Sequence, residues 1–183
     1  MTRPSPATPG GTLVLDSEGL AKAVLRDRTV TGWLALARAD DLRVITSAAT
    51  LVEVVHPRIN RPALEWTLSR LVIEPVTEPI ARHAATLLAD AGLHGHKHAI
   101  DAMLGATALT APGPATVLTS DPEDLTALCG SRITVINGGF REEDCVELWV
   151  IPSGATPPQP TPTVQAGDVR PAPVTPRRRR RRD

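Results

Sequence analysis

The chain has 183 residues, 42% of them hydrophobic, and a formal net charge of zero at pH 7, which suits one globular domain with a full core rather than two. Its two cysteines, Cys129 and Cys145, are too few for a disulfide framework or a cysteine-rich zinc site. Residues 1–11 lack the apolar core of a secretory signal, and no apolar run approaches the roughly 20 residues of a membrane span. We therefore expect a cytoplasmic protein with no membrane segment.

The charge is unevenly distributed. Of the 20 Lys+Arg and 20 Asp+Glu residues, seven Arg and only two Asp fall in 152–183, so the body is acidic and the tail basic. The tail is rich in Pro, Thr, Gly and Ala, which cannot bury enough apolar surface to fold. We predict a flexible leader at 1–10, a folded domain at 11–151 and a disordered tail at 152–183.

The tail ends in six consecutive arginines, Arg177–Arg182. Such a run can add salt-dependent affinity for phosphates, and we favour RNA or another polyanion over a solvated tail or an acidic protein partner. Aromatic residues are scarce, with three Trp, one Phe and no Tyr. Binding of RNA by base stacking is therefore disfavoured, and any RNA-handling function would depend on phosphate contacts or a metal.

Strand-like and helix-like segments alternate along the chain. Short continuous apolar runs, typical of strands buried on both faces, fall at 12–15, 43–46, 71–73, 116–118 and 133–136. Helical spacing is found from 17 onward and at 31–39, 47–55, 62–70, 79–91, 99–110 and 122–128, with a Gly/His loop at 92–98. The alternation predicts a mostly parallel five-stranded sheet with helices on both faces. Residues 147–151 are a candidate edge strand.

Four carboxylates occupy compatible places in this topology. Asp16 and Asp121 follow the first and fourth strands, so they meet if those strands are neighbours, at the rim where open parallel sheets bind ligands. Asp101 lies in the first turn of its predicted helix, and Glu53 lies among apolar neighbours, which predicts a buried carboxylate. Converging acids repel one another unless a cation holds them. The pattern therefore predicts a divalent-metal site and phosphate chemistry.

Three of the four acids also have a purely structural interpretation. Asp16 can be a helix cap, and Asp121 precedes Pro122 as an N-cap precedes proline at the first helical position. Asp101 can be a partner of the helix dipole. Their occurrence together favours a functional site over three separate caps.

The acids lie in four short motifs that occur in order along the chain. These are Val14-Leu15-Asp16-Ser17-Glu18-Gly19-Leu20, Thr50-Leu51-Val52-Glu53-Val54, Ala99-Ile100-Asp101-Ala102 and Val117-Leu118-Thr119-Ser120-Asp121-Pro122. In order and spacing they resemble PIN-domain ribonucleases, in particular the VapC-like toxins of prokaryotic toxin–antitoxin pairs. The resemblance covers residues 12–137. It implies a three-layer α/β/α fold and a metal-dependent endoribonuclease that is a homodimer and is inhibited by a cognate antitoxin.

The resemblance also implies the roles of individual residues. Asp16, Glu53, Asp101 and Asp121 would be catalytic and would hold one or two Mg²⁺ or Mn²⁺ ions. The metal would lower the pKa of a bound water and stabilise charge on the RNA phosphate.

Other polar residues near these motifs are secondary candidates. The hydroxyl of Thr119 or Ser120 could bind a water or a phosphate oxygen, and Asp124 is either a further acid of the site or a solvent-facing one.

Some features have no counterpart in the minimal family domain. The tail at 152–183 is one. The alternating His94, His96 and His98 could bind a transition metal or steer RNA phosphate, but a solvated His-rich loop is the preferred interpretation. Lys22 and Arg26 could likewise contact phosphate, with exposed helix charges as the simpler account.

Three other functions remain open. A PIN-fold RNA-binding or interaction module without catalysis is disfavoured because all four acids are present. A haloacid-dehalogenase-type phosphotransferase needs Asp-x-Asp after the first strand, whereas this chain has Asp16-Ser17-Glu18. A response-receiver domain needs a lysine after a later strand, but Asn137-Gly138-Gly139 follows the fifth. The nuclease is the favoured hypothesis.

Overall fold

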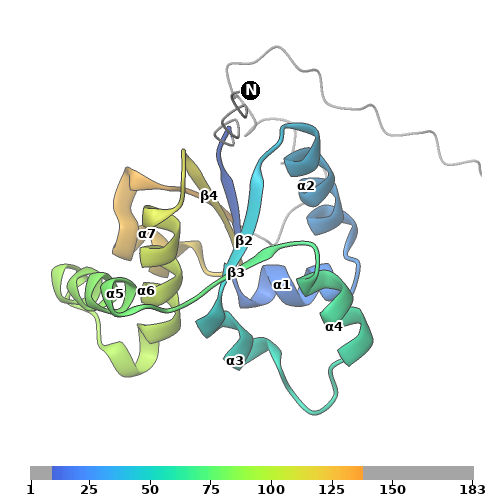
Figure 1. Ribbon diagram of the computed structural model, residues 1–183. Coiled ribbons are helices and arrows are strands. Elements are labelled where there is room, and N and C mark those ends of the chain that lie inside the picture. Colours follow the sequence, from blue (N-terminus) through green and yellow to red (C-terminus); the bar gives the residue numbers. More distant parts are fainter. Residues whose placement is uncertain (1–9, 138–183) are drawn as a thin grey trace, which may run out of the picture. The chain divides into compact units, whose positions relative to one another are not determined.

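A parallel five-stranded sheet forms the centre of the computed structural model, which describes residues 10–137 (Figure 1). The predicted edge strand at 147–151, the tail at 152–183, Cys145 and most of the leader lie outside the described residues. The strands run in the order β3-β2-β1-β4-β5, and every pairing is parallel. Their bounds are β1 Thr12–Leu15, β2 Arg43–Ser47, β3 Val72–Glu74, β4 Ala115–Thr119 and β5 Thr134–Asn137. The predicted α/β fold is confirmed, and each strand lies within two residues of its predicted bounds.

Helices cover both faces of the sheet, in three layers (Figure 1). One layer contains α1 Ser17–Val24, α2 Arg28–Ala39, α3 Leu51–Val54 and α4 Arg61–Leu68, and the 3₁₀ turn η1 Ala48–Thr50 leads into α3. The other layer contains α5 Glu78–Ala91, α6 Gly95–Thr110 and α7 Pro122–Cys129, and the 3₁₀ turn η2 Gly130–Arg132 follows α7. Strand β1 faces both layers in turn: Leu13 and Leu15 pack with α1 and α2, and Val14 packs with α5 and α6. All three are fully buried, as their continuous apolar run predicts.

The strand order reverses between β1 and β4. The chain passes from β1 through β2 to β3 on one side, then crosses through α5 and α6 to β4 on the other side of β1. Leu15 is opposite Leu118, so the segments that follow both strands emerge side by side. This is the topological switch point where open α/β sheets bind ligands. The condition for Asp16 and the residues after β4 to meet is therefore fulfilled.

Local capping signals explain several helix ends. The Asp27 side chain accepts hydrogen bonds from the N–H groups of Thr29 and Val30, so α2 begins at Arg28, three residues before its predicted start. Gly92 ends α5 with φ +65, the left-handed conformation that glycine tolerates and the predicted C-cap.

The predicted loop at 92–98 is wrong for its second half, because α6 begins at Gly95. The N–H groups of Lys97 and His98 both donate to the His94 carbonyl, at 3.1 and 3.2 Å, closing a first turn. His98 itself has non-helical φ −114 and ψ 19, which kinks the helix. Its side chain is buried, so tertiary packing overrides the weak helix preference of the Gly/His run.

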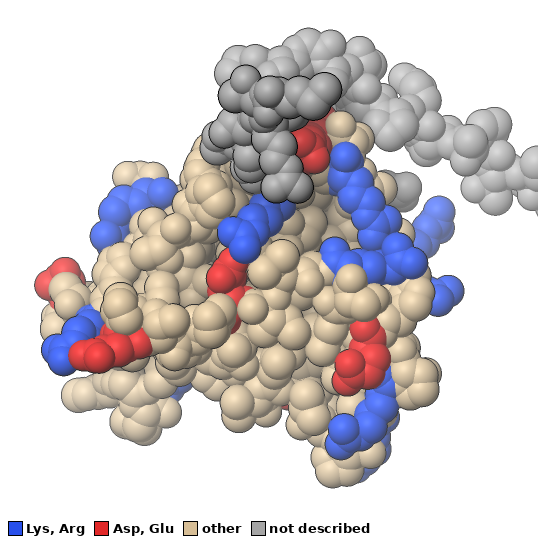
Figure 2. Space-filling model, viewed as in Figure 1, with Lys and Arg blue, Asp and Glu red and all other residues tan. Residues whose placement is uncertain are grey.

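The connection between α1 and α2 is a tight turn centred on Arg26. The N–H of Asp27 donates to the Lys22 carbonyl at 2.9 Å, and Arg26 between the two helices has φ +57. This is the turn that usually has glycine at the left-handed position. A side chain there costs about 1–2 kcal/mol. On this side of the molecule basic side chains lie together with acidic ones (Figure 2). The basic residues of α2 and α4 are Arg28, Arg38 and Arg61.

Helices α6 and α7 approach closely at Gly105. A Cβ on Gly105 would lie only 2.7 Å from Sγ of Cys129, a free and fully buried thiol. Burial raises the pKa of Cys129 to about 11, so the side chain is a neutral packing group. The glycine is required here by the close approach rather than by its backbone conformation.

We predict that Gly105→Ala lowers the free energy of unfolding by about 1–3 kcal/mol through overpacking. In a Cys129→Ala background the same change should cost much less, because the sulfur is gone and alanine is the better helix former. Denaturant unfolding of the four proteins in the cycle measures the difference. An equal cost in both backgrounds would contradict the packing argument.

Candidate metal centre

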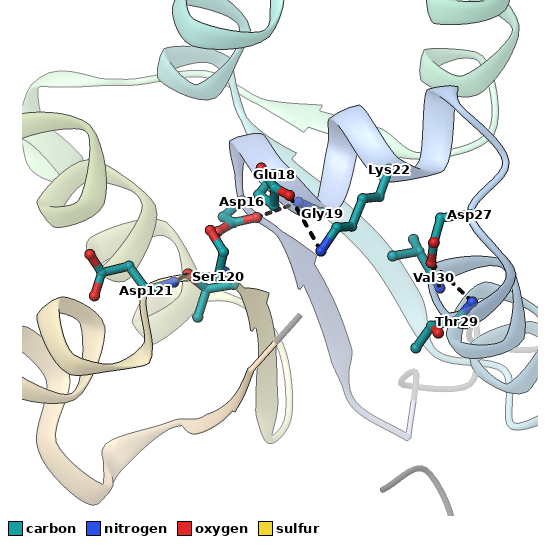
Figure 3. Close-up of polar contacts among 10 residues, drawn as sticks. Asp16, Glu18, Gly19, Lys22, Asp27, Thr29, Val30, Ser120 and Asp121 are labelled. Carbon is teal, nitrogen blue, oxygen red and sulfur yellow. Dashed lines mark hydrogen bonds and ion pairs between the residues drawn. The ribbon is translucent and has the colours of Figure 1, made fainter. Parts of the chain in front are cut away.

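Asp16 is fastened to the rim of the sheet by backbone hydrogen bonds from both sides. Its Oδ1 accepts the N–H of Gly19 at 2.6 Å, and its Oδ2 accepts the N–H of Ser120 at 3.3 Å (Figure 3). The hydroxyl of Thr119 also hydrogen-bonds to this carboxylate. Asp16 therefore caps α1, as the structural interpretation proposed, and in addition bridges the ends of β1 and β4.

The electrostatics of Asp16 are dominated by burial. Burial raises its pKa, and the hydrogen bonds from Gly19, Thr119 and Ser120 only partly offset that cost. Glycine at position 19 allows the Asp16 carboxylate to approach the Gly19 N–H closely. A Cβ at this position would lie 3.1 Å from Asp16 Oδ1 and 3.2 Å from the Leu118 carbonyl oxygen. A carboxylate held in this way retains lone pairs for a cation.

Asp101 lies among other acids. Burial raises the pKa of Asp101 most, and the negative charges of Glu53, Asp124 and Asp121 raise it further. His98 lowers this pKa. Three of the predicted site acids, Asp101, Glu53 and Asp121, are therefore close enough to interact electrostatically. The kink at His98 divides α6, so Asp101 lies in the first turn of the longer part that follows the kink, and its interpretation as a partner of the helix dipole stands.

A group of three possible metal ligands surrounds Asp101. One ligand atom from each of His98, Asp101 and Asp124 lies within 4.8 Å of the other two. Nδ1 of His98 is 2.8 Å from Oδ2 of Asp124, and the imidazole is buried against it. A spacing near 3 Å is also what two neighbouring ligands of one ion would have, given ligand bonds of about 2.1 Å.

The structure corrects the predicted placement of three side chains. Glu53 is exposed rather than buried: α3 is a single helical turn, and Val52 beside it is 77% exposed. Asp121 occupies an N-cap position, but its side chain makes no capping hydrogen bond. In Figure 3 its carboxylate points away from Asp16. His98 belongs to the acidic cluster, not to a solvated loop; His94 and His96 are exposed as predicted.

Sequence reasoning ranked Asp124 below the other acids and set His98 aside. The available signal was their spacing: His98 and Asp101 are three residues apart, as are Asp121 and Asp124. Residues at that spacing share a face of a helix. The signal could not be used for His98 because its helix was predicted to begin after it.

The donor set fits a divalent cation. Carboxylate oxygens suit Mg²⁺ and Mn²⁺, and an imidazole nitrogen adds affinity for transition metals. Without a cation, burial raises the pKa of Asp101, and repulsion from the negative charges of Glu53, Asp124 and Asp121 raises it further. A bound cation would remove that repulsion.

No helix in residues 10–137 is long and apolar enough to cross a membrane.

Comparison with known proteins finds similarity in shape. No protein-family model matches the chain, and no curated protein is similar to it in sequence. A chain in the crystal structure of VapBC2 from Rickettsia felis bound to a DNA fragment from their promoter is similar, with a TM-score of 0.53 and 18% sequence identity. The match covers 69% of this chain and 98% of that chain. At that identity the likeness establishes the fold alone, and it agrees with the fold that the four motifs imply.

We predict that Asp101→Asn raises the melting temperature of the metal-free protein near pH 7. The raised pKa of Asp101 means that the charged form opposes folding, so metal-free stability from this group is gained as the pH falls towards its folded pKa. The neutral isostere gives that gain at all pH values. Differential scanning fluorimetry in EDTA measures it, with Asp90→Asn on an exposed part of α5 as the control.

The same variant tests the metal site. Saturating Mn²⁺, at roughly 100 times its Kd, should stabilise the wild type by about 2.7 kcal/mol, which is roughly 5–10 °C for a domain of this size. Asp101→Asn should lose most of that increase, and Asp90→Asn should keep it. A full Mn²⁺-dependent increase in Asp101→Asn would contradict this assignment.

Proposed function

We propose that the protein is a metal-dependent endoribonuclease that hydrolyses RNA phosphodiester bonds. The observation that carries this proposal is the gathering of Asp101, Asp124 and His98 within ligand distance, with further acids beside them, at the switch point of a parallel sheet. The motif resemblance and the VapBC2 fold likeness support it.

Each residue has a part in the proposed chemistry. Asp101 and Asp124 would hold the cation, Mg²⁺ or Mn²⁺, and the negative charges of Glu53 and Asp121, which act on Asp101, would add to its attraction for the cation. When bound, the cation supplies Lewis acidity, lowering the pKa of water and neutralising charge on the phosphate. Asp16, held by its two N–H donors, would orient the site from the β1 side.

His98 would orient Asp124 through their 2.8 Å contact. An imidazole nitrogen that enters the ligand set favours Mn²⁺ over Mg²⁺.

The proposed biological role is that of a toxin with a cognate antitoxin protein, in the cytoplasm and as a homodimer. The motif resemblance supports this role, and the neighbour is described as VapBC2 bound to promoter DNA. A small open reading frame with a DNA-binding N-terminus beside the gene would favour it, and absence of one would count against it.

Cleavage of a generic single-stranded RNA tests the enzyme. We expect cleavage with Mn²⁺ and none in EDTA. Asp101→Asn, which removes a ligand, should reduce the rate by more than about 100-fold, and Asp16→Asn should reduce it by about 10- to 100-fold, the range for outer-shell partners of a metal. Asp90→Asn should keep wild-type activity.

One result would count against the enzyme hypothesis, and another against the part of Asp16. RNA binding without cleavage at any divalent metal would favour the non-catalytic RNA-binding module. Equal activity of Asp16→Asn and wild type would remove Asp16 from the site.

A metal titration tests the part of His98. We predict that His98→Asn weakens Mn²⁺ binding by about 10-fold or more and weakens Mg²⁺ binding less, because only Mn²⁺ benefits from the nitrogen. Isothermal titration calorimetry of the wild type and the variant measures both constants. His96→Asn, an exposed histidine two residues away, is the control. An equal loss for both metals would assign His98 a purely structural part.

A further inference from the structure

A basic groove lies between α2 and α4, away from the acids of the candidate metal centre. It has a volume of about 720 Å³, and its lining includes Arg26, Arg38, Arg43 and Arg70 around the exposed edge of Trp66. Among residues 10–137, no Asp or Glu lines it. This charge is concentrated on a body whose overall composition is acidic, which points to a polyanionic occupant.

The positive charge of the groove is only partly neutralised. Arg43 forms an ion pair with Glu74 at 2.6 Å. Within the described part of the chain, no carboxylate pairs with Arg26, Arg38 or Arg70. Three guanidinium groups are therefore available for an external anion.

Trp66 holds two of these guanidinium groups. Cζ of Arg70 lies 3.9 Å from the centre of the indole ring, and Cζ of Arg26 lies 5.2 Å from it. Both distances are those of cation–π contacts. Stacking on an aromatic face leaves the edge of a guanidinium group free to donate hydrogen bonds to phosphate. Trp66, which is 46% exposed, thus acts as a support for arginines rather than as a platform for bases.

The backbone at Arg26 indicates that its side chain is needed. The turn after α1 places this residue at φ +57, where glycine is strongly preferred. Arginine is strained there, so the local backbone gives no reason for its presence. The cation–π contact with Trp66 and the lining of the groove are what the side chain provides.

Arg26 also connects the basic groove to the candidate metal centre. It lines a second groove, of about 810 Å³, that runs between α1 and α4 and also contains Arg58, Ser17 and Glu53. Glu53 is one of the charges that act on Asp101. The two grooves therefore share Arg26, and the second of them reaches Glu53 on the side of the acidic cluster.

We propose that the basic groove binds the phosphate backbone of single-stranded RNA next to the bond that is cleaved. Arg26 and Arg70 contact phosphates, and Trp66 positions both guanidinium groups. The inference rests on the proposed ribonuclease function for the identity of the polyanion. It identifies where the rest of the substrate lies, and it predicts recognition by charge and spacing without base specificity.

Binding in EDTA tests the proposal apart from catalysis. Fluorescence anisotropy of a labelled single-stranded RNA is measured across a salt series with the full chain, using wild type, Arg26→Gly, Arg70→Gln and the double variant. Each lost phosphate contact should reduce the slope of log K against log salt by about 0.7, which is roughly an eightfold loss of affinity at about 50 mM salt. The arginine run at 177–182 is the same in all proteins, so differences between them come from the groove.

Two matched variants separate this role from a structural one. Arg26→Gly relieves the left-handed strain, so its melting temperature should equal or exceed that of the wild type while its RNA affinity falls. Arg82→Gln removes an exposed arginine on α5, in the opposite helix layer, and should keep wild-type affinity and slope. Trp66→Leu should weaken binding, and Trp66→Phe, which keeps an aromatic face, should restore most of it.

Each outcome decides one part of the proposal. Unchanged affinity and slope in the double variant would overturn it and would leave the groove as a surface for a protein partner. An equal loss in Arg82→Gln would also overturn it, because any surface charge would then suffice. If the groove variants lose RNA binding and the wild type cleaves nothing with Mn²⁺, the docking surface stands and the nuclease proposal fails.

Discussion

The parallel pairing of β1 with β4 is the constraint on which the candidate site depends. It places the N–H of Ser120, after β4, within hydrogen-bond distance of Asp16, after β1, while the N–H of Gly19 holds the same carboxylate from the other side. These two donors compensate part of the cost of burying a charge. The same register brings Asp121 and Asp124, at the start of α7, to the side where α6 presents Asp101.

The charges of the protein are arranged in two opposed groups. Burial, and then the carboxylates around it, raise the pKa of Asp101 and destabilise the metal-free fold, a cost that a cation can offset. The four arginines that line the basic groove attract an anion, and within the described residues only one of them, Arg43, has a carboxylate partner. An acidic site by itself repels RNA. A cation bound by the acids would neutralise that charge, and the basic groove would attract the phosphates of the rest of the RNA. Both groups are required for the proposed function, and neither is accounted for by the stability of the fold.

Most of the fold was predictable because its signals are local. The continuous apolar run at Thr12–Leu15 indicated a strand buried on both faces, and Gly92 marked the end of a helix. The burial of Glu53 was predicted wrongly, because apolar neighbours on a single exposed turn need not be core residues. His98 was missed for a related reason: its burial against Asp124 comes from a contact 26 residues away, which no local pattern contains. Asp124 was noted, but nothing in its own segment separated a ligand from a solvent-facing acid.

The sequence by itself determined the α/β architecture and the strand positions, and it indicated Asp16, Glu53, Asp101 and Asp121 as candidate site acids, because hydrophobic period and residue type are properties of short segments. Only the tertiary structure decided which acids lie together, that a histidine joins them, and that Arg26 and Arg70 meet over Trp66. The reason is that these contacts form between different helices. Their geometry depends on how the two layers pack on the sheet and on the strained turn at Arg26, and neither of these can be read from local periodicity.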